Sequence, residues 1–382
     1  MARKLGVIVN GVTGRMGYNQ HLVRSLLAIR DDGGLPLTDG SRLEVEPVLV
    51  GRSAARLGRI ADRHDVKRWT TDLDDALRFP DVDVYFDAQL TSGRVKAIGA
   101  AIEHGKHVYS EKPLAESVDE ALDLARRARA AGVKNGVVHD KLFLPGMRKL
   151  RRLVRSGFFG RILSVRGEFG YWVFEGDWQA AQRPSWNYRA ADGGGIVLDM
   201  FCHWNYVLES LFGRVEAVTA RAVTHIPWRV DERGGAYQAT ADDAAYAIFE
   251  LADGVVAQLN SSWCVRVDRD ELLEIQVDGT EGSAVAGLWG CRTQHRTLTP
   301  VARWNPDLPE QHRFRDDWAE VPDNEEFDNG FRVQWEQFLR HVAEDADYEY
   351  DFLSGARGLA LAEAGLRSSA EGRRIELAEL HP

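Results

Sequence analysis

This 382-residue chain has few cysteines, no block of basic residues and no long apolar run. Its three cysteines, Cys202, Cys264 and Cys291, lack the paired spacing of a disulfide framework or a zinc site. A formal charge of −10 without a basic cluster argues against a nucleic-acid or anionic-membrane surface. No apolar stretch is long enough to cross a bilayer, and the short apolar run near the N-terminus differs from a secretory signal. We therefore expect a reduced, cytoplasmic protein that binds neither nucleic acid nor a membrane.

The chain is long enough for two domains, and its sequence pattern changes near residue 143. Before that point, short apolar runs alternate with amphipathic stretches, which predicts βαβ units and a doubly wound parallel sheet. From about residue 215 onward strand patterns dominate, which predicts an antiparallel or mixed sheet with helices on one face. We thus predict a dinucleotide-binding domain at 1–143 and an α+β domain at 144–382.

A glycine-rich turn follows the first predicted strand. Gly11, Gly14 and Gly17 stand three residues apart, directly before a predicted helix. Glycines allow positive φ and let the backbone approach a pyrophosphate, while the helix N-terminus supplies N–H groups and a partial positive charge. Such a turn can also be a packing device, but its place in a βαβ unit favours dinucleotide binding. The residues expected to contact the cofactor are Gly11, Thr13, Gly14, Arg15 and Met16.

The end of the second predicted strand bears on the choice of dinucleotide. An acidic side chain at this place would hydrogen-bond the ribose 2′-hydroxyl of NAD. Here the strand is followed by Arg52 and Ser53, and a guanidinium beside a hydroxyl suits a 2′-phosphate. We therefore expect NADP to be preferred over NAD. The alternative, in which Arg52 is a solvated loop residue and NAD binds, stays open.

The tripeptide Glu111-Lys112-Pro113 directly follows a predicted buried strand. The carboxyl ends of parallel strands form the edge at which open α/β sheets bind ligands. A proline after the lysine stiffens the backbone, which would aim the ammonium group of Lys112 at that edge. The alternative is a surface lysine in a strand-to-helix loop.

A second constellation begins with three glycines at 193–195 and continues into a predicted helix. Asp199 and His203 are four residues apart on this helix, so both project from one face. Histidine is the side chain best suited to exchange a proton near neutral pH, and a carboxylate one turn away can orient it or hold a substrate hydroxyl. The glycines would permit close approach of the backbone to a ligand or to the other domain. No spacing supplies a further metal ligand, so we expect no metal; the alternative is a polar pair on a helix surface.

An aromatic segment at 171–188 interleaves Trp, Tyr and Phe with polar residues. Aromatic faces pack against the C–H face of a sugar while polar side chains reach its hydroxyls, so this segment is a candidate pocket wall. Trp172, Arg183 and Trp186 are the candidate substrate-binding residues. An aromatic core or a subunit interface is the competing interpretation.

Together, the glycine turn, Glu111-Lys112-Pro113 and the pair Asp199 and His203 resemble the Gfo/Idh/MocA oxidoreductases, and the resemblance covers essentially the whole chain. It implies a Rossmann domain with a doubly wound parallel sheet, followed by an α+β domain with a large, mostly antiparallel open sheet. It implies hydride transfer between NAD or NADP and a hydroxyl or ketone of a sugar, inositol or related polyol. It also implies a homodimer or homotetramer.

The resemblance assigns roles to particular residues. Lys112, Asp199 and His203 would form the catalytic set, in which His203 takes the hydroxyl proton and Lys112 stabilises the developing alkoxide. Glu111 and Lys112 would lie near the nicotinamide ribose, and Asp140 would contact substrate beside the site.

Two departures from the family pattern keep alternatives open. The glycine turn is closer to that of dihydrodipicolinate reductases, which suggests an NADPH reductase of that type, and residues 88–91 lack the family's usual Thr-Pro-Asn sequence. A non-catalytic, cofactor-binding regulatory protein would keep the fold and lose the chemistry. A nicotinamide retained through turnover would give no net redox change.

Overall fold

A computed structural model describes residues 3–301, 305–309 and 312–380. The chain divides into two compact units. Unit 1 combines the residues up to Phe143 with Asp328–Ala360, and unit 2 combines Leu144–Phe327 with the residues from Leu361 onward. The sequence pattern had assigned 328–360 to the second domain, whereas their contacts lie in the first unit. None of the helices that the structure describes is long and apolar enough to span a bilayer.

Unit 1 is built on a seven-stranded sheet with the order β2-β3-β1-β5-β6-β7, to which β4 adds by pairing with β3. All its described pairs are parallel except β2 with β3. The predicted doubly wound sheet is therefore confirmed, with a short antiparallel strand at one edge. The strands are β1 (Arg3–Asn10), β2 (Leu35–Pro36), β3 (Arg42–Val50), β4 (Arg68–Thr70), β5 (Val82–Asp87), β6 (His107–Ser110) and β7 (Asn135–Val137).

Helices pack on both faces of this sheet and bury two separate apolar clusters. Several begin at side-chain caps: Ser53 accepts from the backbone N–H of Arg56, and Ser117 forms a capping box with Glu120. The helical elements of unit 1 are η1 (Gly17–Leu27), α1 (Ala28–Asp31), α2 (Ala54–His64), α3 (Leu73–Leu77), α4 (Thr91–Glu103), α5 (Val118–Ala130), η2 (Asp140–Phe143) and α8 (Gly330–Glu344).

Helix α8 explains why residues 328–360 belong to unit 1. Its apolar face places Trp335, Phe338 and Leu339, all fully buried, in the cluster that η1 and the sheet also line. Each such side chain contributes roughly 1.5–3 kcal/mol by leaving water. The amphipathic pattern of α8 predicts that it packs against a core, but it carries no information on which core.

Unit 2 contains a nine-stranded sheet with the order β17-β16-β15-β14-β8-β13-β12-β9-β18. The pair β8 with β13 is parallel and the other described pairs are antiparallel, which confirms the expected mostly antiparallel sheet. The strands of this sheet are β8 (Ile162–Gly170), β9 (Val215–Val223), β12 (Ala244–Leu251), β13 (Val256–Ser262), β14 (Leu273–Gly279), β15 (Gly282–Ala286), β16 (Cys291–His295), β17 (Ala319–Glu320) and β18 (Ile375–Glu376). A separate hairpin pairs β10 (Trp228–Val230) with β11 (Ala236–Gln238).

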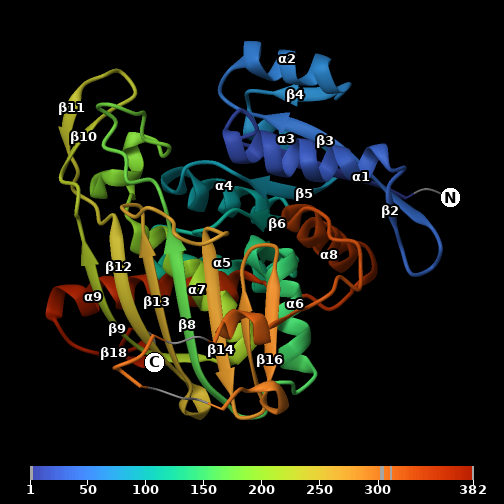
Figure 1. The fold of residues 1–382 in the computed structure, drawn as a ribbon. Coiled ribbons are helices and arrows are strands. Elements are labelled where there is room, and N and C mark those ends of the chain that lie inside the picture. Colours follow the sequence, from blue (N-terminus) through green and yellow to red (C-terminus); the bar gives the residue numbers. More distant parts are fainter. Residues whose placement is uncertain (1–2, 302–304, 310–311, 381–382) are drawn as a thin grey trace. The chain divides into compact units, whose positions relative to one another are not determined.

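Helices cover one face of the nine-stranded sheet (Figure 1), and the described side chains of Tyr246, Ile248 and Val256 are exposed on the other. Helix α7 (Ile196–Phe212) packs on β9, β12 and β13, and helix α6 (Pro145–Arg155) packs on β15 and β16. Helix α9 (Phe352–Glu371) begins in unit 1 and ends in unit 2. Short 3-10 turns complete unit 2: η3 (Ser185–Tyr188), η4 (Ala190–Asp192), η5 (Ala252–Gly254), η6 (Arg296–Leu298), η7 (Phe314–Asp317) and η8 (Leu377–Glu379).

Candidate functional site

The glycine turn closes directly after β1. Gly11 has φ +83°, and a Cβ at this position would lie 2.7 Å from the carbonyl group of Ala88, so only glycine fits. The N–H of Gly14 donates to the carbonyl oxygen of Gly11 at 3.0 Å, which makes the turn tight. Met16 then leads into η1 as its N-cap residue. The turn thus presents bare backbone at the start of a helix, as a pyrophosphate requires.

A cavity of about 760 Å³ opens beside this turn. One side is formed by Thr13, Gly14, Arg15 and Tyr18, and the other by the exposed face of α2. The α2 residues that line it are Arg56, Arg59, Ile60, Asp62 and Arg63. Four guanidinium groups against one carboxylate favour an anionic ligand, and the volume suits a nucleotide. A nicotinamide dinucleotide, with its phosphates, fits both the turn and this cavity.

Arg52 and Ser53 stand at the beginning of α2. The hydroxyl of Ser53 accepts from the N–H of Arg56 at 3.4 Å and so caps the helix. Arg52 is exposed. The cavity places Arg15, a residue predicted from the sequence, opposite three guanidinium groups that the sequence analysis did not single out, those of Arg56, Arg59 and Arg63 in α2.

A buried ion pair lies where β5 ends. The carboxylate of Asp87 accepts from Arg94 Nε at 3.1 Å, from the hydroxyl of Tyr85 at 2.6 Å and from the N–H of Gln89 at 2.9 Å. Arg94 also donates to the carbonyl oxygen of Gln89 at 2.7 Å and to that of Pro113. This network ties the loop after β5 to the loop after β6. Neither Asp87 nor Arg94 was a sequence candidate, although a carboxylate at the carboxyl end of a buried strand is a usable signal.

Glu111 and Lys112 follow β6, and the Lys112–Pro113 peptide bond is cis. The carboxylate of Glu111 accepts from the Lys112 N–H at 3.1 Å through Oε2 and lies 2.8 Å from His21 Nε2 through Oε1. Burial would raise the pKa of Glu111, but the hydrogen bond from His21 and the positive charges of Lys112 and Arg94 outweigh it and hold that pKa below its usual range. Glu111 is therefore a buried carboxylate at neutral pH.

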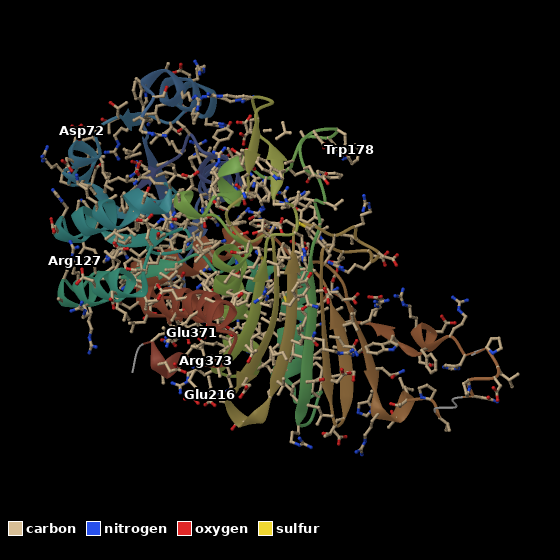
Figure 2. The ribbon with its side chains drawn as sticks, turned by 90° about the vertical axis from the view of Figure 1, so that its left-hand side faces the viewer. Asp72, Arg127, Trp178, Glu216, Glu371 and Arg373 are labelled. Atoms are coloured by element: carbon tan, nitrogen blue, oxygen red, sulfur yellow. The ribbon has the colours of Figure 1, made fainter. Side chains whose placement is uncertain are left out.

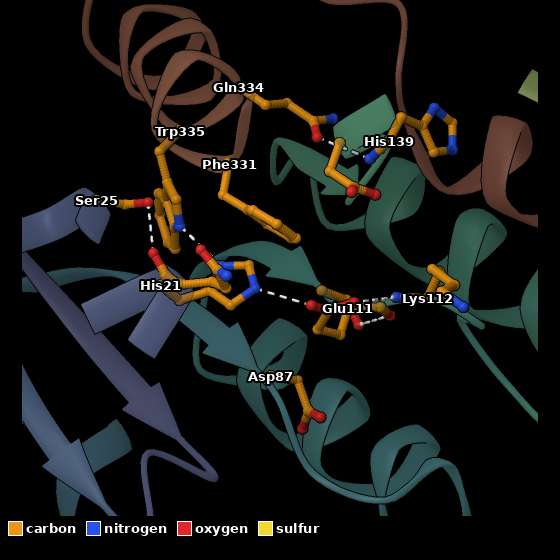
Figure 3. Close-up of polar contacts among 12 residues, drawn as sticks. His21, Ser25, Asp87, Glu111, Lys112, His139, Phe331, Gln334 and Trp335 are labelled. Atoms are coloured by element: carbon orange, nitrogen blue, oxygen red, sulfur yellow. Dashed lines mark hydrogen bonds and ion pairs between the residues drawn. The ribbon is translucent and has the colours of Figure 1, made fainter. Parts of the chain in front are cut away.

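His21 extends this network toward α8 (Figure 3). The indole N–H of Trp335 donates to His21 Nδ1 at 3.0 Å, across 314 residues of sequence. Neither residue was a sequence candidate, because no local pattern links a histidine in η1 to a tryptophan in α8.

Asp140 lies in η2, half-buried, with Oδ2 3.9 Å from Lys141 Nζ. Its neighbour His139 is buried, and burial together with the charge of Arg357 lowers the pKa of that imidazole to about 3. The backbone N–H of His139 donates to Gln334 Oε1 at 2.7 Å, which joins α8 to the end of β7. His139 is therefore a neutral structural residue at neutral pH.

In unit 2, two of the three glycines before α7, Gly194 and Gly195, serve close packing within the unit, while Gly193 has φ +74° and open space around it. Gly195 has φ +123°, and a Cβ there would lie 2.7 Å from Asp242 Oδ1. A Cβ at Gly194 would lie 2.5 Å from the carbonyl oxygens of Trp186 and Asn187. Asp242 then accepts from the N–H of Val197 at 2.8 Å and caps α7. Gly194 and Gly195 thus approach neighbouring backbone and this cap, and their approach to a ligand or to the other domain stays a prediction.

Asp199 and His203 lie one turn apart on α7, as predicted. Asp199 Oδ2 is 2.9 Å from Arg183 Nη2. His203 is buried, and its Nδ1 lies 2.5 Å from the hydroxyl of Tyr206. The contact between Nδ1 and Tyr206 fixes the orientation of the imidazole ring of His203.

The aromatic segment contributes to the same region of unit 2. The guanidinium of Arg183 lies over the rings of Trp172, at 5.0 Å, and Trp263, at 4.6 Å. Trp172 has φ +70°, which is rare for a bulky residue, and its indole N–H donates to Gln182. The structure thus brings Trp172, Arg183 and Asp199 together.

Trp186 is 41 % exposed beside Asn187, whose Oδ1 lies 3.3 Å from Arg183 Nη1. Trp178 of the same segment is 67 % exposed and projects outward (Figure 2). The segment therefore has exposed aromatic faces beside polar groups. Among the described residues, no group of three or more His, Cys, Asp or Glu side chains is placed to hold a metal ion.

A doubly wound sheet with a glycine turn after its first strand is the architecture of a dinucleotide-binding domain. Residues 7–139 match the family model described as "Oxidoreductase family, NAD-binding Rossmann fold", and residues 147–285 match the "GFO/IDH/MocA C-terminal domain". The chain belongs to the Gfo/Idh/MocA family of oxidoreductases, which confirms the resemblance, and its cofactor is NAD or NADP.

The chain is similar to named enzymes over different shares of its length. It is 59% identical over 378 residues to "D-xylose dehydrogenase" of Paenarthrobacter nicotinovorans, covering 98% of this chain and 97% of that one. It is 27% identical over 258 residues to "Levoglucosan dehydrogenase" of Pseudarthrobacter phenanthrenivorans, covering 63% of each chain. A solved structure of a levoglucosan dehydrogenase with NADH and levoglucosan superposes with a TM-score of 0.79 at 20% identity, covering 99% of this chain and all of that one. At 20% identity, this structural similarity shows a shared fold and nothing further.

Proposed function

We propose that this oxidoreductase acts on a free sugar and that an aldopentose such as D-xylose is its first candidate substrate. The observation that carries this proposal is the 59% identity to a D-xylose dehydrogenase across nearly the whole of both chains. The competing dihydrodipicolinate-reductase interpretation rested on the glycine turn, whereas the family match spans both units. The regulatory interpretation keeps the same fold without the chemistry, so the turnover assay below decides it.

The region around Asp199 in unit 2 has the chemistry to recognise such a substrate. A carboxylate and a guanidinium held together at 2.9 Å offer acceptors and donors to adjacent hydroxyls of a sugar. The indole face of Trp172 beside them suits the apolar C–H face of the ring. Trp186 is adjacent to Asn187, which contacts Arg183, and it remains a predicted contact of the substrate. Asp140 of unit 1 also remains a predicted substrate contact.

In the proposed reaction, His203 Nε2 takes the proton of the reacting hydroxyl, and the ammonium of Lys112 stabilises the charge that develops on its oxygen. Bound NAD(P) supplies the hydride acceptor in oxidation and the hydride donor in reduction. Asp199 and Arg183 hold the neighbouring hydroxyls so that the reacting one meets His203. Both roles remain predictions of the family resemblance; the backbone of Lys112 is held by Glu111 in unit 1, and the ring of His203 by Tyr206 in unit 2.

NADP is the proposed preferred cofactor. The cavity beside the glycine turn supports this, because Arg15, Arg56, Arg59 and Arg63 face it while Asp62 is its only carboxylate among the lining residues. Arg52 and Ser53, at the start of α2, remain the predicted contacts of the 2′-phosphate.

We further propose a cytoplasmic homodimer or homotetramer, with residues of unit 2 forming the subunit contact. The register of the nine-stranded sheet sets Tyr246, Ile248 and Val256 on its open face, each more than 40 % exposed.

Burial raises the pKa of the Cys264 and Cys291 thiols, that of Cys291 to about 12, so both stay protonated, as suits a reducing compartment.

A substrate panel tests the function. D-xylose, other aldopentoses and aldohexoses, levoglucosan and inositols would each be supplied with NAD and with NADP, and the reduced-nicotinamide absorbance followed. Turnover of an aldopentose that is lost in Lys112→Ala and His203→Ala supports the proposal. Turnover of none of these compounds, or undiminished turnover in both variants, overturns it.

A further inference from the structure

Three buried side chains form a continuous line of hydrogen bonds from α8 to the backbone of Lys112. We infer that Trp335 and His21 are positioning residues for Lys112, which they act upon through Glu111. The inference rests on the role of Lys112 given under Proposed function. All four residues lie in unit 1, and Figure 3 shows their order.

The donors and acceptors fix the direction of this line. An indole N–H can only donate, so His21 Nδ1, at 3.0 Å from Trp335 Nε1, is an acceptor. The proton of the neutral imidazole therefore lies on Nε2, which donates to Glu111 Oε1 at 2.8 Å. Trp335 thus selects the tautomer of His21 that binds a carboxylate.

Glu111 carries the effect to Lys112. Its second oxygen, Oε2, accepts from the backbone N–H of Lys112 at 3.1 Å. A carboxylate with one oxygen held by His21 and the other by the Lys112 backbone has a fixed plane. On the following residue, Arg94 donates to the carbonyl oxygen of Pro113. The backbone of Lys112 is therefore held on both sides, which limits the positions open to its ammonium group.

The surroundings of His21 keep its ring in place. It is fully buried, with Phe86 at 4.3 Å and Phe331 at 5.1 Å between ring centroids. In such an aromatic cluster a phenylalanine would satisfy packing alone at positions 21 and 335. Polar atoms here are useful only through the bonds they make, because a buried polar group without a partner is costly.

Four variants separate positioning from packing. His21→Phe removes both bonds of the ring, and Trp335→Phe removes the donor to Nδ1. His21→Gln keeps an N–H near the place of Nε2. Phe331→Leu is the control, because it alters a ring contact of His21 and no hydrogen bond of the line.

We expect kcat of His21→Phe to fall about 10- to 100-fold, since a displacement near 1 Å can cost about 10²-fold. KM for sugar and for NAD(P) should change less than about threefold, because the fully buried His21 has no exposed surface to offer a ligand. His21→Gln should regain most of kcat, Trp335→Phe should fall between the two, and Phe331→Leu should retain kcat even if its melting temperature drops. A kcat that follows melting temperature across all four variants, with no recovery in His21→Gln, overturns the inference.

Three further outcomes are informative. If His21→Phe does not fold, Trp335→Phe against Phe331→Leu decides, and equal kcat in these two refutes positioning. If Lys112→Ala keeps full activity, the proposed catalytic role itself fails. If Lys112→Ala is inactive while His21→Phe keeps full kcat, only the positioning inference fails.

Discussion

The buried pair of Asp87 and Arg94 allows a quantitative prediction. Arg94→Met keeps much of the side-chain volume but leaves the Asp87 carboxylate without its counter-charge. Breaking a buried ion pair by removing one partner typically costs about 3–5 kcal/mol. Asp87 would retain its hydrogen bonds from the Tyr85 hydroxyl, at 2.6 Å, and from the Gln89 N–H, at 2.9 Å. We therefore expect a loss of stability at the low end of this range, about 3 kcal/mol.

This loss should lower the melting transition of unit 1 by roughly 6–12 °C, at about 2–4 °C per kcal/mol for a unit of this size. Differential scanning calorimetry measures it, and hydrogen exchange in β5 and β6 assigns the transition to unit 1. The matched control is Arg68→Met. Arg68 Nη1 lies 2.8 Å from a carboxylate oxygen of Asp81, but this carboxylate is largely exposed, so the substitution should cost no more than about 1 kcal/mol of stability.

A double-mutant cycle completes the test. Asp87→Asn removes the charge that Arg94→Met leaves behind, so the double variant should be less destabilised than the sum of the two single variants, by about 0.5–3 kcal/mol. Strict additivity, or equal effects of Arg94→Met and Arg68→Met, would show that the pair is energetically no different from a surface ion pair.

Three further predictions concern catalysis, cofactor choice and pH. His203→Ala should lower kcat by about 10²–10⁴-fold while NAD(P) still quenches protein fluorescence with the parent affinity; near-normal turnover would remove His203 as the base. Arg52→Asp should weaken binding of NADP much more than binding of NAD, and equal losses in titrations of both would reject a 2′-phosphate contact. Because the folded-state pKa of Glu111 lies below its ordinary 4.5, its ionised form stabilises the fold above that pH, and this contribution disappears as pH falls through the folded pKa. Denaturant titrations should therefore show that the free energies of unfolding of the parent and of Glu111→Gln differ less below pH 4.5 than above it. A difference that does not change with pH would contradict an ionised Glu111 in the folded protein.

The local patterns predicted the sheet of unit 1 well because each βαβ unit signals itself within a short window. Gly11 shows this, since its turn chemistry, its place after a strand and its neighbouring helix are all adjacent in sequence. The pair of Asp199 and His203 was equally accessible, because helical spacing alone sets them one turn apart. The roles of these residues stay predictions until the variants are assayed.

Contacts between distant segments could not be predicted in this way. The bond between Trp335 and His21, and the packing of α8 in unit 1, join residues about 300 positions apart. Likewise, the sequence around Gly194 and Gly195 is the same whether the space left by a missing Cβ is filled by a ligand or by another part of the chain. In the structure Asn187 lies in that space at Gly194, and Asp242 at Gly195. Short edge strands such as β17 and β18 have too few residues to show an alternation.

The placement of Trp335, Phe338 and Leu339 in unit 1 has a consequence for biosynthesis. A ribosome that has translated residue 143 has synthesised every strand of the seven-stranded sheet, but not helix α8, which packs in one of the two apolar clusters of unit 1. Helix α8 is translated nearly two hundred residues later, and until then the nascent chain lacks Trp335, which packs on the rings of Phe86 and Tyr109. The nucleotide-binding lobe is thus the first to be made and among the last to be completed, and a gene fragment that stops at residue 143 should yield an insoluble product.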